Sequence, residues 1–234
     1  MKTIGMIGGM SWESSIEYYR MVNETVKLRL GGLHSAQCLM YSVDFAQIEQ
    51  YQHESRWQEA GQVMADAARR LERGGADFIV LCTNTMHKLA DYIEQAVEIP
   101  LLHIADPTAQ AIQAAGITKV GLLGTAFTME QDFYRGRLTD KYGLDVLIPD
   151  ADERAIIHRV IYDELVLGIV KDESREAYKH IIDHLVERGA QGIILGCTEI
   201  MLLISPNDCP VPSFDTTTLH AVAAVDYALE SLAT

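Results

Sequence analysis

The most constraining feature of the sequence is that part of its first half recurs in its second half. Residues 75–85 read GADFIVLCTNT, and residues 189–199 read GAQGIILGCTE. Two further pairs of segments match in the same order and at a nearly constant offset: residues 4–9 with 120–125, and residues 100–103 with 210–213. A repeat of this kind predicts two similar structural halves.

Short apolar runs alternate with helical patterns along the chain. The runs are rich in leucine and β-branched residues and mostly lack polar alternation, which is typical of strands buried on both faces of a parallel sheet. We expect strands at residues 3–7, 37–43, 78–82, 100–104, 119–123, 144–148, 192–196 and 210–213. The alternation of strands and helices predicts an α/β fold with two pseudo-symmetric parallel-sheet lobes.

The repeat also predicts where the lobes begin and end. We expect an N-terminal α/β lobe of residues 1–104 plus 214–234, and a C-terminal α/β lobe of residues 105–213. The last helix follows both repeats, and we expect it to pack on the first lobe. No linker rich in proline, glycine or serine separates the halves, so closely apposed lobes are expected.

Composition excludes several classes of partner. The 234 residues include 33 acidic and 19 basic side chains, for a formal net charge of −14. A phosphate backbone would be repelled, so nucleic acid is not expected as a partner. No apolar run approaches the roughly 20 residues that a bilayer span needs, and the N-terminus lacks the apolar stretch of a signal peptide. We therefore expect a cytoplasmic protein with no membrane partner.

The sequence shows no pattern that requires a metal or an organic cofactor. The cysteines show no CxxC spacing, and in a reducing cytosol they are expected as free thiols. His180 and His184 are four residues apart, but they share the polar face of a helix with Asp183 and Glu187, which favours solvation over metal binding. There is no dinucleotide fingerprint and no Walker lysine.

Six loops at expected strand ends carry glycines, hydroxyl side chains and amides. In open parallel sheets ligands bind beyond the carboxyl ends of the strands, and helix N-termini there favour a carboxylate or another small anion. Plain helix capping explains any single loop, but several such loops together favour a binding site. The loops contain Ser11, Gln52, Thr83, His103, Thr125 and Cys197.

Cys197 is the residue in these loops with the most reactive chemistry. A thiol at a strand end, just before a helix start, is expected to have a lowered pKa and can then move a proton or attack carbon. The repeat aligns Thr83 with Cys197. A buried, inert thiol is the alternative for Cys197. We interpret Cys82 as a core residue because neighbouring side chains on a strand point in opposite directions.

Three motifs resemble those of one enzyme family: GGMSWES at residues 8–14, CTNTMH at 82–87 and LGCTE at 195–199. With them the chain resembles, over nearly its whole length, the aspartate/glutamate racemases, which need no cofactor. It is most similar to their L-aspartate/glutamate-specific or broad-specificity bacterial branch. The resemblance implies two lobes, usually in a homodimer, with an amino-acid substrate between them and one proton-carrying residue on each side of Cα.

One position departs from the family pattern. A cysteine usually precedes Asn-Thr in the first motif, and Thr83 stands there in this chain. A threonine hydroxyl is a far weaker acid than a thiol, so a symmetric two-thiol mechanism is excluded. The resemblance then implies Thr83 and Cys197 as the catalytic pair, with Thr83 the weaker partner. It also implies a preference for the L enantiomer, and Glu199 after Cys-Thr resembles the aspartate type.

Substrate-binding residues are inferred partly from the same resemblance. The candidates supply N–H, hydroxyl, amide or carboxylate groups at helix starts or in the second loop: Met10, Ser11, Gln52, Asn84, Thr85, Thr125, Thr198 and Glu199. Gln52 is expected to reach a side-chain carboxylate. The six loops offer no basic substitute for the residue that some aspartate racemases use, so glutamate or uncharged amino acids are also expected to fit.

Three other interpretations remain open from the sequence. The same superfamily includes arylmalonate decarboxylases, which work with one cysteine, and maleate isomerases. Loss of one thiol also suits a degenerate relative that binds an amino acid without turnover. The third is an α/β protein whose cysteines are only structural. Release of carbon dioxide would distinguish a decarboxylase from a racemase. Ligand affinity that survives Cys197→Ala, with no activity to lose, would indicate a binding protein.

Overall fold

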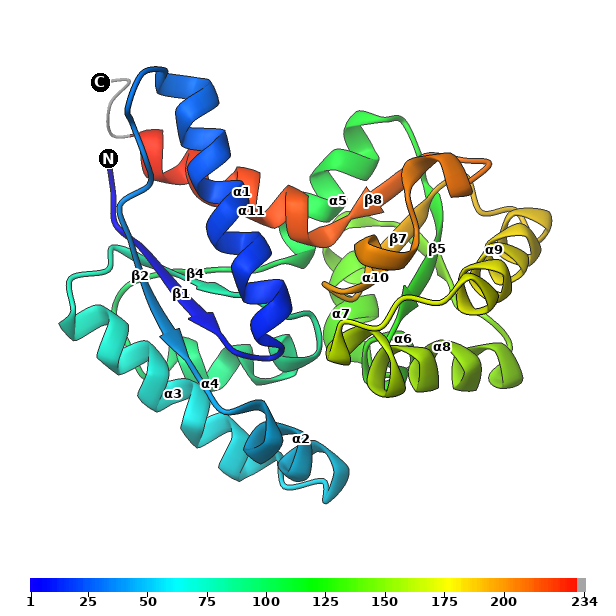
Figure 1. Ribbon diagram of the computed structural model, residues 1–234, viewed down its shortest axis with the longest axis horizontal. Coiled ribbons are helices and arrows are strands. Elements are labelled where there is room, and N and C mark those ends of the chain that lie inside the picture. Colours follow the sequence, from blue (N-terminus) through cyan, green and yellow to red (C-terminus); the bar gives the residue numbers. More distant parts are fainter. Residues whose placement is uncertain (231–234) are drawn as a thin grey trace. The chain divides into compact units, whose positions relative to one another are not determined.

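The computed structural model describes residues 1–230 and divides into two compact units (Figure 1). Unit 1 contains Met1–Ile104 together with the chain from His220 onward, and unit 2 contains Ala105–Leu219. Residues 214–219, expected in the first lobe, thus group with the second unit. The reason is that Phe214 and Asp215 pair with Ile194 and Leu195 in its sheet.

Unit 1 is built on a four-stranded parallel sheet in the order β2-β1-β3-β4. Its strands are β1 (Ile4–Gly8), β2 (Cys38–Ser42), β3 (Phe78–Leu81) and β4 (Leu101–Leu102). Its helices are α1 (Trp12–Leu30), α2 (Phe45–His53), α3 (Trp57–Arg73), the 3-10 turn η1 (Thr85–Leu89) and α4 (Ala90–Glu94).

Unit 2 has a second four-stranded parallel sheet, in the order β6-β5-β7-β8. Its strands are β5 (Lys119–Gly124), β6 (Asp145–Leu147), β7 (Ile193–Gly196) and β8 (Ser213–Asp215). Around them are α5 (Ala105–Ala114), α6 (Ala126–Glu130), α7 (Asp132–Gly136), η2 (Arg137–Lys141), α8 (Ala151–Asp163), η3 (Leu165–Leu167), α9 (Asp172–Glu187), α10 (Ile200–Leu203) and η4 (Pro206–Asp208).

The two sheets share one topology, which confirms the predicted α/β fold of two similar halves. In each sheet the first strand lies between the second and the third, and the fourth strand lies outside the third. The register agrees as well, because Gly5 pairs with Ile79 in one sheet and Gly121 pairs with Ile193 in the other. These four residues are the ones that the sequence repeat aligns.

The last expected strand is the one that the sequence placed wrongly. Residues 210–213 were expected in it, but β8 begins only at Ser213. Proline has no N–H to donate to a sheet, so Pro212 contributes its carbonyl, which accepts from Ile193 N–H at 2.9 Å just before β8 begins. Ile79 pairs with Leu101, whereas the equivalent Ile193 pairs with Ser213, which shifts the third repeat match by two residues.

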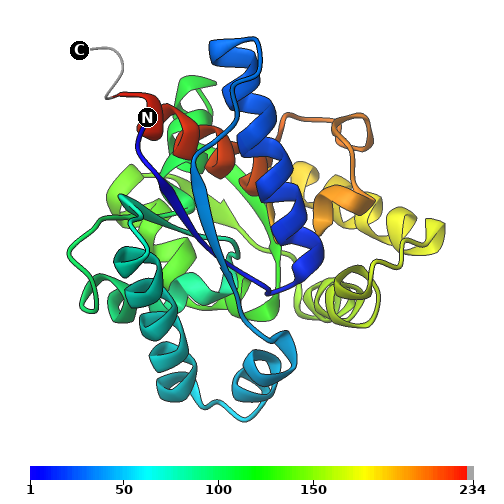
Figure 2. The same ribbon diagram turned by 60° about the vertical axis from the view of Figure 1, so that its left-hand side comes forward.

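Helix α11 (Thr216–Leu229) begins in unit 2 and continues in unit 1. In unit 1 it lies beside α1, as Figures 1 and 2 both show. The Tyr18 hydroxyl and His220 Nδ1 are 2.9 Å apart, and Arg29 forms an ion pair with Asp226 at 2.8 Å. The Tyr227 ring packs edge-on against Phe78 of β3. From His220 onward the last helix therefore packs on α1 and β3 of unit 1.

Buried strands carry the hydrophobic cores. Every residue of β1, β3 and β7 is buried, as expected for central strands covered on both faces. In unit 1, α3 packs alanines and Met64 against the sheet and leaves its charged side chains outside. Among residues 1–230, no helix is both long enough and apolar enough to cross a membrane.

Candidate active site

The carboxyl ends of β1 and β3 bring two of the predicted loops together in unit 1. Cys82 N–H donates to Ile7 O at 3.0 Å, so the loop after β3 leaves the sheet beside the end of β1. The first loop runs through Gly9 and Met10 to Ser11, whose hydroxyl accepts from Ser14 N–H and caps α1. The two loops thus begin side by side at the carboxyl ends of the strands.

Glycine is required in the first loop for steric reasons. Gly9 has a φ of +94°, and a Cβ there would lie 2.2 Å from Val43 O. Its N–H donates to the Ser15 hydroxyl at 2.7 Å, and that hydroxyl donates to Ser11 O at 2.8 Å. Met10 is buried in the core cluster of unit 1, so its side chain fills the core and its backbone is what it can offer to a ligand.

The loop after β3 contains the predicted residues Thr83, Asn84 and Thr85, all of them buried. The Gln52 side chain, at the end of α2, is buried too and donates from Nε2 to Met86 Sδ at 3.1 Å. The structure therefore places Gln52 against Met86, which follows this loop. Cys82 is completely buried, which raises the pKa of its thiol and supports its interpretation as a core residue.

In unit 2, the loops after β5 and β7 are neighbours. Gly124 and Gly196 pair at the ends of these strands, and Thr125 and Cys197 follow them directly. Thr125 caps α6 by accepting from Thr128 N–H at 3.3 Å. A Cβ on Gly196 would lie 2.7 Å from Leu123 O, so glycine allows the close approach that precedes Cys197.

Cys197 is held beside a carboxylate. Its Sγ donates to Glu199 Oε2 at 2.9 Å, and Thr198 Oγ1 donates to the same oxygen at 2.8 Å. All three residues are buried. Burial raises the pKa of the Cys197 thiol well above its usual value, and the charge of Glu199 and its hydrogen bond raise the pKa further.

This result corrects the expectation of a lowered thiol pKa. The sequence argument counted the helix start and the N–H donors, and backbone hydrogen bonds do act in that direction. They are outweighed by burial and by the negative carboxylate two residues away. At rest Cys197 is therefore a protonated thiol with a proton acceptor already in contact.

Two relationships in the site were not predicted from the sequence. Glu199 was assigned to substrate binding, but its carboxylate contacts the Cys197 thiol. In the sequence His87 is notable only as the last residue of the CTNTMH motif, yet its ring Nδ1 lies 2.7 Å from Thr83 O. The four-residue spacing between Thr83 and His87, across a helix start, is the signal that could have indicated this second contact.

Comparison with known proteins then decides the family. A family model described as Asp/Glu/Hydantoin racemase matches residues 7–224. The chain belongs to this racemase family.

Individual relatives agree with that assignment. A crystal structure from Yersinia pestis, provisionally named an Asp/Glu racemase, is 58% identical, covers 98% of this chain and 100% of its own, and has a TM-score of 0.92. A crystal structure of an aspartate racemase homologue from Pyrococcus horikoshii OT3 is 34% identical. It covers 98% of this chain and 100% of its own, with a TM-score of 0.84. The broad specificity amino-acid racemase RacX of Bacillus subtilis (strain 168) is 27% identical over 170 residues, 71% of each chain.

Proposed function

We propose that this chain is an amino-acid racemase that inverts Cα of aspartate or glutamate without a cofactor, using Thr83 and Cys197 as unequal proton carriers. The observation that carries the proposal is the buried contact between Cys197 Sγ and Glu199 Oε2 at 2.9 Å. It pairs a thiol with a proton acceptor at the end of a parallel strand, where this fold class binds ligands. Family membership and the racemase names of the relatives support the same chemistry.

The Cys197 half of the reaction begins with its own proton. Glu199 accepts the thiol proton, and the thiolate so formed takes the proton from Cα of one enantiomer. The C–H electron pair then delocalises into the substrate carboxylate. Charge developing there is stabilised by fixed N–H and hydroxyl donors, which the capped starts of α1 and α6 can supply.

Thr83 acts on the opposite face of Cα. Its hydroxyl gives a proton to the carbanion as it takes one from water, because a threonine alkoxide is too basic to persist. Glu199 returns its proton to the hydroxide left behind, which restores the starting state. The thiol–carboxylate pair is the stronger carrier, so kcat differs between the two directions, and KM differs in proportion because the equilibrium constant of a racemisation is 1. Resemblance to the L-preferring branch makes the L enantiomer the better substrate.

Substrate recognition is assigned by the chemistry of the remaining loop residues. Ser11, Asn84, Thr85, Thr125 and Thr198 offer hydroxyl, amide or backbone donors to the α-carboxylate and the ammonium group. Gln52, held against Met86, is proposed to face the side chain of the substrate. A neutral amide binds a second carboxylate less selectively than an arginine would, so neutral amino acids are included in the test.

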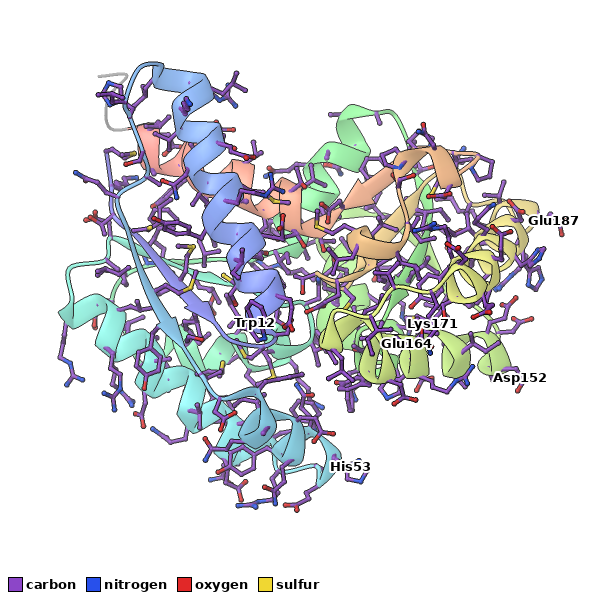
Figure 3. The ribbon with its side chains drawn as sticks, in the orientation of Figure 1. Trp12, His53, Asp152, Glu164, Lys171 and Glu187 are labelled. Atoms are coloured by element: carbon purple, nitrogen blue, oxygen red, sulfur yellow. The ribbon has the colours of Figure 1, made fainter. Side chains whose placement is uncertain are left out.

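We also propose a homodimer. Trp12, Ile16 and Tyr19 lie on one side of α1, at intervals of four and three residues, and their side chains are 62%, 52% and 55% exposed. Figure 3 shows Trp12 at the start of that helix. Large apolar side chains grouped on one helix face favour contact with another protein surface. Light scattering during gel filtration gives the mass, and a monomer at micromolar concentration would remove this part of the proposal.

Deuterium exchange at Cα tests the catalytic proposal. The protein is incubated in heavy water with each enantiomer of aspartate, glutamate and a panel of neutral amino acids, followed by NMR and chiral chromatography. Deuterium entry with inversion is expected, and Cys197→Ala should abolish it. Cys209→Ser is the matched control, because Cys209 is a half-buried thiol of the same unit outside the proposed site. Absence of exchange with every amino acid would overturn the proposal, and carbon dioxide release from a malonate would favour a decarboxylase.

A further inference from the structure

Three histidines are buried together in unit 1. His87, His103 and His220 are only 2%, 4% and 0% exposed. The ring centroids of His87 and His103 are 4.4 Å apart, and those of His87 and His220 are 5.9 Å apart. Buried polar rings are stable only when their nitrogens are hydrogen-bonded, so the partners reveal what each ring does.

The two nitrogens of His87 have opposite roles. Nδ1 lies 2.7 Å from Thr83 O, and a carbonyl oxygen can only accept, so Nδ1 must carry the hydrogen. Ile104 N–H donates to Nε2 at 3.1 Å, so Nε2 must be the acceptor. The geometry therefore requires a neutral imidazole in the Nδ1–H tautomer. In a doubly protonated ring, the Nε2–H of His87 would point at the N–H of Ile104.

These two bonds join loops that the sheet itself does not join. Strands β3 and β4 pair only at Ile79 with Leu101 and at Val80 with Leu102. Thr83 and Ile104 both lie beyond the last paired residues. The His87 ring links the two loops there, one bond to each, and so continues the connection past the end of the ladder.

The ring itself is supported by its neighbours. His220 and Leu102 O are joined at 2.8 Å through Nε2, which must therefore carry the hydrogen, and His220 Nδ1 accepts from the Tyr18 hydroxyl at 2.9 Å. His220 is thus fixed in the opposite tautomer, between α1 and β4. The His103 ring also packs against His87, so His87 is buried among neighbouring rings, of which His220 is fixed by two hydrogen bonds.

We propose that His87 is a positioning residue that holds the Thr83 backbone, and with it the Thr83 hydroxyl, in the orientation needed for proton transfer to Cα. This inference rests on the proposed function, because it matters to turnover only if Thr83 carries a proton. Small displacements of a reacting group are costly, since about 1 Å of misplacement can reduce a rate roughly a hundredfold.

Two substitutions separate the two bonds. In His87→Asn the amide nitrogen takes the place of Nδ1 and can still donate to Thr83 O, but the shorter side chain does not reach Ile104 N–H. In His87→Gln the longer amide can accept from Ile104 N–H, but the donor to Thr83 O is lost. We expect H87N to retain at least about tenfold more inversion than H87Q, by the same positional argument.

The decisive readout is inversion compared with exchange. For the enantiomer that exchanges faster in wild type, H87Q should still admit deuterium from the Cys197 side while inversion falls. A merely structural role would lower exchange and inversion together in both variants, and that result would overturn the inference. Equal inversion in H87N and H87Q would overturn it too.

A second measurement does not depend on activity. Nitrogen-15 NMR of the histidine rings should show the Nδ1–H tautomer for His87 and the Nε2–H tautomer for His220. The opposite tautomer at His87 would overturn the inference even if the protein is an active racemase. Conversely, a wild-type protein that exchanges no amino acid would remove both the proposed function and this role.

Discussion

Cys197 Sγ donates a hydrogen bond to Glu199 Oε2 at 2.9 Å, and both side chains are buried. The contact has two opposite consequences for one thiol. The negative carboxylate disfavours a thiolate at rest, because like charges repel strongly in a buried site. The same carboxylate is the nearest acceptor for the proton when turnover begins.

Glu199→Gln should separate these consequences. Removing the negative charge lowers the pKa of the Cys197 thiol, because the amide cannot repel a thiolate. Alkylation of Cys197 by iodoacetamide should therefore begin at a lower pH than in wild type, as followed by mass spectrometry of its peptide. Racemisation should fall roughly a hundredfold, since the proton acceptor is gone.

Cys38 and Cys209 provide internal controls for that alkylation. Both are half-buried, and burial raises the pKa of each thiol. The pH dependence of alkylation at Cys38 and Cys209 should be the same in wild type and in Glu199→Gln. If the Cys197 profile also stays unchanged, Glu199 does not control this thiol.

Substitutions of Thr83 test the inequality of the two carriers. Thr83→Ala should reduce inversion by about a hundredfold or more, since a positioned acid–base group contributes at least that factor. Deuterium exchange at Cα of one enantiomer, carried by Cys197, should persist. Thr83→Cys has nearly the same size and installs a second thiol, so it should make kcat for the L and D enantiomers, each measured at saturating concentration, more nearly equal. Chiral chromatography of both directions measures this, and an unaltered ratio in Thr83→Cys would contradict an acid–base role for the residue.

Gly9→Ala tests the steric requirement in the loop after β1. The new Cβ would lie 2.2 Å from Val43 O in a backbone with φ of +94°, so both strain and a clash oppose it. We expect a loss of about 3 kcal/mol or more in the free energy of unfolding. Gly168→Ala is the matched control, because its backbone is left-handed, with φ of +70° and ψ of 16°, and a Cβ there meets nothing within 4 Å. It should cost only about 1 kcal/mol. Urea unfolding measures both, and equal losses would show that the clash is relieved by a shift of the loop.

The fold was largely predictable from the sequence because its signals are local. Apolar runs such as residues 78–82 and 192–196 identify central strands, and the repeat identifies the equivalence of β1 with β5 and of β3 with β7. The last strand was misplaced because the repeat match aligned Pro100 with Pro210, whereas in the structure Pro100 is equivalent to Pro212: their carbonyls accept from Ile79 and Ile193. The boundary near residue 214 was wrong for the same reason.

The sequence names candidate site residues, whose roles stay predictions, but it does not give their contacts. Positions at strand ends indicated Thr83 and Cys197 as candidates, whereas Gln52 lies near the end of α2. The protonation state of Cys197 depends on the direction of the Glu199 side chain and on burial, and neither can be obtained from spacing alone. The link from His87 to Ile104 joins residues 17 positions apart, which only the pairing of β3 with β4 brings together.

At acid pH the stability of unit 2 should depend on the protonation of His158. Its Nδ1 accepts from Ala126 N–H at 3.2 Å at the start of α6, and burial lowers the pKa of the imidazole below the usual 6.5. At pH values below about 6.5 the unfolded chain binds a proton that the folded chain resists. The contribution of the neutral ring is therefore present above pH 6.5 and is lost as the pH falls through the lowered pKa. His158→Asn keeps an acceptor at the same place but cannot titrate. Urea midpoints between pH 5 and pH 8 should fall less steeply toward acid in this variant than in wild type, and parallel curves would show that His158 does not contribute.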